Sequence, residues 1–397
     1  MSLNSLSSLK HLKGRRVLVR ADFNVPVKNG RVTDNYKLTA SLPTIRRLLK
    51  FGARIILVSH LGRPEKFDTK FSLKPVSVAL EKLLGQKIYF LPVKKTDHYF
   101  NSASQAVARL KPGEILMLDN CRFWPGEEKN NPALARQLAA LADIFVLDGF
   151  AVAHRDAASV SGVAKYLPAY AGLLMEKEVT GLSRATEKPQ KPLVVILGGI
   201  KMETKIPVLK NLLAKADYVL VGGGISNTYL WAKGWPVGAS AIDKKHKKDI
   251  LKYAANKKII WPVDVIIGDA KGRGARAVPV ETDFAVIGKT DSIFDIGPQT
   301  IKLFAKFIKT ARTIVWNGAL GYFEQKPYQY GTYAVARLIA ARSQGPAFSI
   351  CGGGETVEVL TDLGLASDID LVSTGGGAML EFLSGKILPG VKAVTSQ

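Results

Sequence analysis

The sequence contains little cysteine, no long apolar run and comparatively few acidic residues. Its two cysteines, Cys121 and Cys351, cannot by themselves hold a metal ion or form a disulfide framework, which is typical of a reducing compartment. No apolar run approaches the roughly 18 residues that a helix needs to cross a bilayer, and residues 1–10 lack the continuous apolar stretch of a signal peptide. We therefore exclude a disulfide-stabilised scaffold and expect a cytoplasmic protein without a membrane partner.

The scarcity of acidic residues leaves the chain strongly basic. Its 397 residues include 33 Asp and Glu against 56 Lys and Arg, so the formal net charge is +23. The excess is denser in residues 1–170, with 27 basic and 13 acidic residues, than in residues 171–397, with 29 and 20. This balance indicates a polyanionic partner, which could be nucleic acid, an anionic surface or a small phosphorylated ligand. Disorder is excluded as its cause because 47% of the residues are hydrophobic.

Short apolar runs recur at intervals that leave room for a helix. Continuous rather than alternating apolarity is typical of strands buried on both faces, as in parallel sheets. The runs are residues 17–19, 55–58, 115–118, 144–147, 193–197, 218–221, 313–316, 348–351 and 371–373. Helical patterns lie between them, for example at 134–141 and 206–214. The pattern predicts an α/β fold built from repeated strand–helix units.

The residues that follow the predicted strands change in character along the chain. Loops before residue 160 carry Arg, His, Asp and Asn, whereas loops after residue 195 carry glycine pairs and triplets. Residues 172–187 have the pattern of one helix, and the following KPQKP is typical of a turn. We therefore predict an arginine-rich domain at 1–171, a connecting helix at 172–187 and a glycine-rich domain from residue 188.

Glycine triplets follow predicted strands at 222–224, 352–354 and 375–377. One triplet is most simply a tight turn, but three, together with LGGIK at 197–201, favour a platform of backbone N–H groups for a phosphate or nucleotide. Lys201 and Lys205 lie on one face of a helix that begins there, either as solvated lysines or as phosphate contacts. The P-loop pattern GxxxxGK[ST] is absent from the sequence. GRGARA at 272–277 leads into Val-Pro-Val rather than a helix, which predicts a loop.

Side chains of another chemistry follow the strands of the first domain. They are Asp22, Asn24, His60, Arg63, Arg122 and Arg155. One such arginine would most simply form a surface ion pair. Several at the strand ends of one sheet favour a site for a multiply charged small anion, because each guanidinium group offers a planar pair of donors. The His, Asp and Asn side chains suit the hydroxyl groups of such a ligand.

With these residues in place, the chain resembles the phosphoglycerate kinase family. The similar segments occur in the family's order and are RADFNVP, SHLGRP, LDNCRF, AHR, LGGIK, VGGGISNT, WNGALGYFE and CGGGET. The resemblance implies two Rossmann-like parallel-sheet domains that face a central cleft and are joined by a helix. Residues 188–379 would form the second domain, and residues 380–397 would pack back on the first. It also implies a monomer that transfers a phosphoryl group reversibly from 1,3-bisphosphoglycerate to ADP with Mg²⁺, giving 3-phosphoglycerate and ATP.

The resemblance also implies roles for individual residues. The glycerate substrate would be held by Asp22, Phe23, Asn24, Lys37, His60, Leu61, Gly62, Arg63, Arg122 and Arg155. The nucleotide would be held by Lys201, Lys205, Gly222, Gly223, Asn317, Glu324, Gly353, Gly354, Glu355 and Thr356. Transfer would depend on Lys37, Lys201, Gly375 and Gly376, and Glu355 would bind magnesium. Because the acceptor carboxylate is ionised at neutral pH, catalysis needs positioning and charge neutralisation rather than a general base.

The chain departs from the family pattern at the centre of the site. Lys37 stands where the family has an arginine, and it keeps the charge but lacks the planar pair of donors. Glu355 stands where the family has a magnesium-binding aspartate, and Ala319 stands where it usually has proline. Compensated drift explains these changes most simply. The alternative is a slow or repurposed paralogue with an altered metal preference.

A nucleic-acid-binding protein is the alternative from another class. The run of basic residues at 244–248 and the net charge suggest it. That run lies in a helical pattern and is more simply a solvated face, and only Tyr253 lies nearby as an aromatic for base stacking. We therefore expect small-molecule substrates and no nucleic-acid partner.

Overall fold

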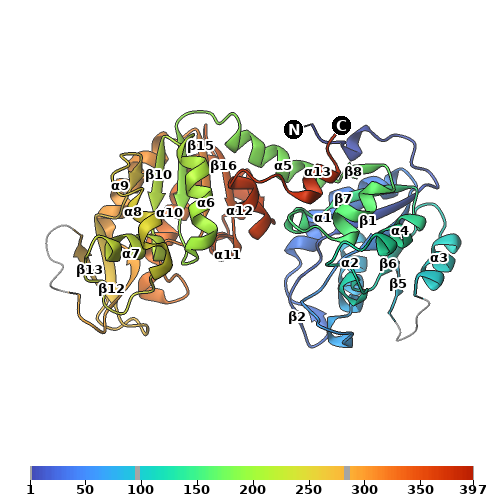
Figure 1. Ribbon diagram of the computed structural model, residues 1–397, viewed down its shortest axis with the longest axis horizontal. Helices are drawn as coiled ribbons and strands as arrows, with labels where there is room; N and C mark the ends of the chain where they lie inside the picture. Colours follow the sequence, from blue (N-terminus) through green and yellow to red (C-terminus); the bar gives the residue numbers. More distant parts are fainter. Residues whose placement is uncertain (1, 94–98, 281–286, 397) are drawn as a thin grey trace. The chain divides into compact units, whose positions relative to one another are not determined.

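The chain folds into two compact units, each built on a parallel sheet (Figure 1). The computed structural model describes residues 2–93, 99–280 and 287–396. Unit 1 comprises Met1–Thr180 with Ile387–Gln397, and unit 2 comprises Gly181–Lys386. The predicted connecting helix is present as α5 (Leu173–Thr186), and the division between the units falls within it. The predicted α/β class with two parallel-sheet domains is confirmed.

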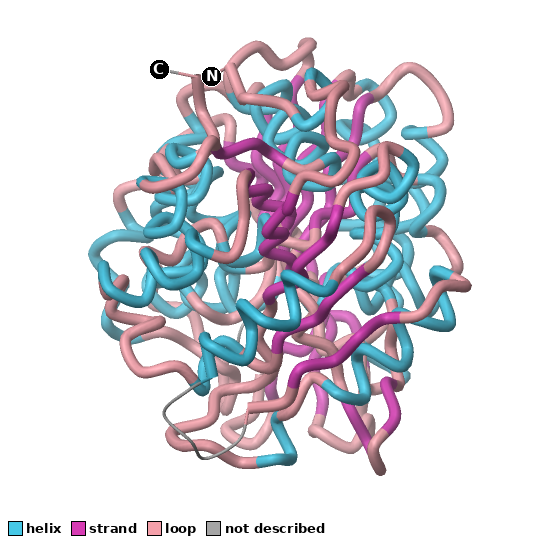
Figure 2. Tube along the Cα trace, turned by 90° about the vertical axis from the view of Figure 1, so that its right-hand side faces the viewer, coloured by secondary structure: helices cyan, strands magenta, loops and turns pink. Residues whose placement is uncertain are grey.

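The sheet of unit 1 has six parallel strands. Their order across the sheet is β5 (Ile88–Leu91), β6 (Ile115–Leu118), β4 (Arg54–Val58), β1 (Arg16–Ala21), β7 (Ile144–Asp148) and β8 (Ala169–Ala171). The central strands are buried along nearly their whole length, which is why their apolarity is continuous. The sequence did not predict β5 and β8, because these edge strands are short and partly exposed and so lack that pattern. Figure 2, which faces unit 1, shows the strands as a twisted band between helices.

Helices cover the sheet of unit 1. They are α1 (Tyr36–Lys50), α2 (Lys74–Leu84), α3 (Tyr99–Arg109), α4 (Pro132–Ala140) and α13 (Pro389–Ala393), and a hairpin pairs β2 (Val27–Lys28) with β3 (Arg31–Val32). The predicted helix at 134–141 is α4, which begins where Asn131 accepts hydrogen bonds from the first-turn N–H groups. The last residues belong to this unit, since Leu3 pairs with Thr395 and Gly390 N–H donates to Ala153 O at 2.8 Å.

Unit 2 contains a second parallel sheet and a smaller antiparallel one. The parallel order is β11 (Ile259–Ile260), β10 (Tyr218–Val221), β9 (Leu193–Leu197), β15 (Thr313–Asn317), β16 (Phe348–Gly352) and β17 (Leu371–Ser373). The antiparallel order is β13 (Arg276–Pro279), β12 (Asp264–Gly268) and β14 (Ser292–Ile296). The sequence missed this small sheet because it stands outside the strand–helix repeat. GRGARA forms a turn that leads into β13 rather than a helix, as predicted, although its last two residues already belong to the strand.

The helices of unit 2 follow the strands of its parallel sheet. They are α6 (Met202–Leu213), α7 (Gly223–Ala232), α8 (Lys247–Leu251), α9 (Pro298–Thr310), α10 (Tyr330–Ser343), α11 (Gly354–Asp362) and α12 (Gly377–Leu383). The predicted helix at 206–214 is α6. The basic run at 244–248 forms a 3₁₀ turn and the start of α8, and its lysines are exposed. No helix within the described ranges is long and apolar enough to cross a membrane.

A buried carboxyl group holds the start of α5. Asp148, the last residue of β7, is fully buried, and its Oδ1 accepts a hydrogen bond from Leu174 N–H at 3.0 Å. Gly172 packs so closely that a Cβ there would overlap the Asp148 carboxylate. Burial raises the pKa of Asp148 to about 7, although the hydrogen bonds that it accepts oppose the rise. A group needed for helix geometry therefore makes stability depend on pH.

We expect Asp148→Asn to change the pH dependence of unfolding. The pKa of Asp148 is about 7 in the folded protein against a reference value of 3.8, so the folded state retains a proton that the unfolded state has lost. This contribution to stability is therefore lost as pH rises from about 4 to about 7. Relative to the wild type, the asparagine variant should gain unfolding free energy between pH 4.5 and pH 8, as measured by urea titration.

Asp143→Asn is the matched control for this prediction. Its hydrogen bonds with Arg16 lower the pKa of Asp143, so that contribution is lost only at pH values below the tested range. The difference between this variant and the wild type should stay constant from pH 4.5 to pH 8. A constant difference for Asp148→Asn as well would contradict the prediction.

Candidate active site

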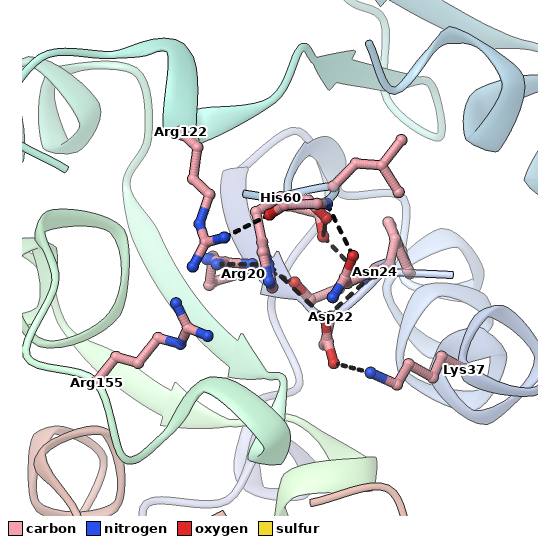
Figure 3. Close-up of polar contacts among 12 residues, drawn as sticks. Arg20, Asp22, Asn24, Lys37, His60, Arg122 and Arg155 are labelled. Atoms are coloured by element: carbon pink, nitrogen blue, oxygen red, sulfur yellow. Dashed lines mark hydrogen bonds and ion pairs between the residues drawn. The ribbon is translucent and has the colours of Figure 1, made fainter. Parts of the chain in front are cut away.

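The polar residues predicted in the first domain meet at one edge of its sheet. Asp22 and Asn24 follow β1, His60 follows β4, Arg122 lies in the 3₁₀ helix Cys121–Phe123 after β6, and Arg155 follows β7. Parallel strands end at the same edge, which is why these separate segments converge. Figure 3 shows Arg122 and Arg155 reaching into one space, with Lys37 on the other side of Asp22.

Asp22 is the centre of a charged cluster. Lys37 Nζ lies 2.6 Å from Asp22 Oδ2, and Asn24 N–H donates to Oδ1 at 3.2 Å. Burial by itself would raise the pKa of Asp22, but the charge and hydrogen bond of Lys37 more than offset this and lower it. Lys37, which comes from α1, is therefore paired with a carboxylate while it remains partly exposed.

His60 is buried beside this cluster, with only 3% of its surface exposed. Its Nδ1 lies 3.4 Å from an Arg20 terminal nitrogen and 3.7 Å from Asp22 Oδ1. Burial, and then the charge of Arg20, lower the pKa of His60 well below its ordinary value of 6.5, with Asp22 acting in the opposite direction. The imidazole is therefore neutral at physiological pH and has both a donor and an acceptor nitrogen.

A buried network supports His60 from behind. Arg20 Nε donates to Ser159 Oγ at 2.8 Å, and the Ser159 hydroxyl and N–H both donate to the Glu127 carboxylate. Burial raises the pKa of Glu127, while the charge of Arg20 opposes the rise. The site residues expected from the family resemblance include neither Arg20 nor Glu127. The position of Arg20 within RADFNVP was the available signal for it.

Three arginines, Arg63, Arg122 and Arg155, line one open cavity, which we call the arginine basin. Arg122 is largely buried and donates to Gly62 O, whereas Arg63 is exposed and has no ion pair within the described part of the chain. Burial and the neighbouring Arg122 lower the pKa of Arg155. This concentration of guanidinium groups can bind a phosphate group.

Two predicted glycerate residues do not present their side chains to this site. Phe23 and Leu61 belong to the hydrophobic core of unit 1, so only their backbone groups remain for a ligand. Gly62, between Leu61 and Arg63, has a positive φ of 62° and donates its N–H to Asn24 Oδ1 at 2.9 Å. The turn therefore ties the loop after β4 to the loop after β1.

The glycine-rich residues of unit 2 line two adjacent cavities. The first has about 330 Å³ and an apolar wall that includes Phe294, Tyr322 and Phe323. The predicted residues that line it are Gly223, Glu324 and Glu355. The predicted residues that line the second are Lys201, Lys205, Asn317, Gly353, Gly354, Glu355 and Gly376. The two cavities share Gly199, Ile200 and Glu355, so one extended ligand could occupy both.

The two lysines of the second cavity differ in environment. Lys205 is buried, and its Nζ donates to both the side-chain and backbone oxygens of Asn317. Burial lowers the pKa of Lys205 to about 8, while Glu355 opposes the change. Lys201, at the start of α6, is exposed and has no hydrogen bond or ion pair to any described residue. Its ammonium group can therefore meet a ligand at no cost to a structural contact.

Glu355 is held by the loop that follows β15. Ala319 N–H donates to Glu355 Oε2 at 3.2 Å, and Gly318 N–H donates to Thr356 Oγ1 at 2.8 Å. Proline at position 319 would have no N–H to donate. The two departures from the family pattern, at positions 319 and 355, are thus in direct contact.

Three other predicted residues support the cavities without lining them. Thr356 is buried under its hydrogen bond with Gly318, and Gly375 donates its N–H to Ser373 Oγ at 3.0 Å. At Gly222, a Cβ would lie 2.7 Å from Leu320, so glycine is needed there for packing. The sequence missed Phe294, Tyr322 and Asn227, which line the first cavity. Phe294 comes from β14, whose strand was itself not predicted.

The donor set at Glu355 limits how a metal ion could bind. No cluster of three or more His, Cys, Asp or Glu side chains suited to a metal occurs among residues 2–93, 99–280 and 287–396. Magnesium commonly takes one or two carboxylates and completes its coordination with water and substrate phosphates. A single carboxylate beside a phosphate-sized cavity therefore fits an ion that arrives with a nucleotide.

Known proteins similar to this chain agree in one description. The family profile described as phosphoglycerate kinase matches residues 6–386. A phosphoglycerate kinase of Moorella thermoacetica is 45% identical over 392 residues, covering 97% of this chain and 98% of the relative. The structure of phosphoglycerate kinase from Coxiella burnetii has a TM-score of 0.86 at 42% identity and 99% coverage of both chains. That of Pyrococcus horikoshii OT3 has 0.84 at 32% identity and 98% coverage of both.

We expect His60 to remain neutral in mildly acidic solution. Burial and Arg20 lower the pKa of His60 well below 6.5, so its Cε1 proton resonance should not shift between pH 8 and pH 6. Proton NMR on the whole protein measures this directly. Asp22→Asn should lower the pKa of His60 further, because it removes the carboxylate that favours the charged form. A titration midpoint at or above 6.5 in the wild type would contradict the prediction.

Proposed function

Because the chain belongs to the phosphoglycerate kinase family, whose members are phosphotransferases with a carboxyl group as acceptor, we propose that unit 1 holds the glycerate substrate and unit 2 the nucleotide. The reaction is the reversible transfer of the acyl phosphate of 1,3-bisphosphoglycerate to ADP, which gives 3-phosphoglycerate and ATP. The observation that carries the assignment of unit 1 is the arginine basin beside the cluster of Asp22, Asn24 and His60.

On the glycerate side, the arginine basin neutralises the phosphate that stays on the substrate. The Asp22 carboxylate accepts a hydrogen bond from the substrate hydroxyl, and neutral His60 is positioned to donate or accept another. Lys37 brings positive charge to the carboxyl end that reacts. Because that carboxylate is already ionised, these side chains bind and orient it and do not remove a proton.

On the nucleotide side, the apolar cavity accepts the base and Glu324 binds the ribose hydroxyls. Lys201 and Lys205 neutralise the phosphates, helped by the N–H groups in the first turns of α11 and α12. Gly376 lines this cavity at the start of α12 and lets the backbone approach the transferring group. Transfer then depends on charge neutralisation by groups that are already in place.

Glu355 would hold Mg²⁺ together with the nucleotide phosphates. The ion would supply positive charge that neutralises the phosphate oxygens during transfer. The protein's own part is to fix the Glu355 carboxylate through Ala319 N–H, which leaves the second carboxylate oxygen free. The contact favours compensated drift over a repurposed enzyme, because the residue at 319 donates to the longer side chain at 355.

We also propose that the protein acts as a cytoplasmic monomer on small-molecule substrates, without nucleic-acid or membrane partners. Its two thiols are free and buried, which suits a reducing compartment. Burial raises the pKa of the Cys121 thiol to about 12, so it is unsuited to nucleophilic chemistry. In the basic run, Lys247 packs over the Trp231 ring at 4.8 Å, and its neighbours remain solvated.

A coupled assay with ATP and 3-phosphoglycerate, run with Mg²⁺ or Mn²⁺, tests the function. Lys201→Ala should lower kcat by roughly 10²- to 10³-fold, because it removes a cation from the phosphate cavity. Lys210→Ala is the matched control, since Lys210 is exposed on the same helix and does not line the cavity. A wild-type protein without turnover would refute the function, and a near-normal kcat in Lys201→Ala would remove that residue from the chemistry.

Calorimetric titration with ADP tests the contact between Ala319 and Glu355. Ala319→Pro removes the N–H, so we expect Mg²⁺-dependent ADP affinity to fall about three- to tenfold, with ADP affinity in EDTA little changed. Ala319→Ser keeps the N–H and should retain the affinity. In Glu355→Asp, whose shorter side chain withdraws the carboxylate, the proline should have less effect. Equal losses in both backgrounds would contradict the coupling.

A further inference from the structure

The arginine basin already contains a carboxylate. Glu128 Oε1 lies 2.9 Å from an Arg122 terminal nitrogen and 3.5 Å from an Arg155 terminal nitrogen, so one oxygen bridges two guanidinium groups. The two arginine side chains are 6% and 29% exposed, whereas that of Glu128 is 65% exposed. The anion in this bridge is therefore held from one side and is open to solvent on the other.

The other carboxylates that line the cavity do not take this position. Glu127 is directed into the buried network and accepts hydrogen bonds from Ser159. Glu65 is exposed on the cavity wall and has no ion pair to any residue that the structure describes. Glu128 is thus the carboxylate that reaches Arg122 and Arg155.

The charges in the basin require an anion. Burial and its neighbour Arg122 lower the pKa of Arg155, which reflects the unfavourable proximity of two positive groups. A phosphate group carries more charge than a carboxylate and offers three oxygens, so it can engage both guanidinium groups with separate oxygens. Glu128 offers them one shared oxygen, and exposed ion pairs of this kind are weak. A phosphate can therefore displace it.

We propose that Glu128 is an internal counter-ion of the arginine basin, which competes with the substrate phosphate for Arg122 and Arg155 and releases them when the substrate binds. This inference rests on the proposed binding of the glycerate phosphate in the basin. Glu128 keeps the guanidinium groups ordered in the free enzyme, and it returns as the product phosphate leaves. It is a positioning residue that weakens phosphate binding and accelerates its release.

The test compares Glu128→Gln with Glu65→Gln, which removes one negative charge from the same cavity without breaking an ion pair. We expect Glu128→Gln to lower the KM for 3-phosphoglycerate about two- to fivefold, with kcat unchanged or lower. Sulfate, used as a probe of the basin, should inhibit this variant more strongly by a similar factor. Glu65→Gln should change both constants less than twofold, and Glu128→Asp should restore wild-type behaviour.

An unchanged or raised KM for 3-phosphoglycerate in Glu128→Gln would overturn the proposal. So would an equal effect in Glu65→Gln, because it would reduce the result to net charge. Calorimetric titration of the wild type with 3-phosphoglycerate separates the two levels of inference. Failure of the wild type to bind it would refute the assignment of the basin, whereas equal binding by wild type and Glu128→Gln would refute the counter-ion alone.

Discussion

Burial of parallel strands on both faces is the constraint on which both sites depend. Strands such as β1 and β9 have no polar face to offer, because helices cover each side of their sheets. Polar chemistry is therefore confined to the ends of the strands, and in a parallel sheet all the carboxyl ends lie at one edge. The same constraint produces an arginine-rich edge in unit 1 and a glycine-rich edge in unit 2, which differ only in the residues that follow each strand.

Close packing between the loops of unit 2 restricts which residues can follow its strands. A Cβ on Gly198 would overlap the Ala319 carbonyl, and one on Gly223 would come within 3.0 Å of Ala319 O and Gly199 N. The glycines that bring backbone N–H groups towards a ligand are thus also required to bring the loops together. Packing and phosphate recognition impose the same residue, so neither explanation of a glycine triplet excludes the other.

The strands and the convergence of the arginines were predictable because they depend on local patterns. Continuous apolarity marks β4 or β15 without knowledge of their neighbours, and a residue that follows a strand must lie at its end. The ring of Phe294 could not be placed in this way, because the antiparallel sheet that carries it follows no strand–helix repeat. The side chains of Phe23 and Leu61 lie in the core, although both belong to motifs of the site, since motif membership does not decide which face a side chain takes. The bridge formed by Glu128 likewise depends on tertiary distances that spacing does not contain.

The division of the chain has a consequence for the order in which the molecule can be completed during synthesis. Unit 2 is continuous, from Gly181 to Lys386, whereas unit 1 needs both ends of the chain. Leu3 pairs with Thr395, and the backbone of Ala153 accepts a hydrogen bond from Gly390. A ribosome holds the last residues until translation ends, so the N-terminal unit, although it is made first, reaches its final packing last. The second unit can fold while the first still waits for its closing segment.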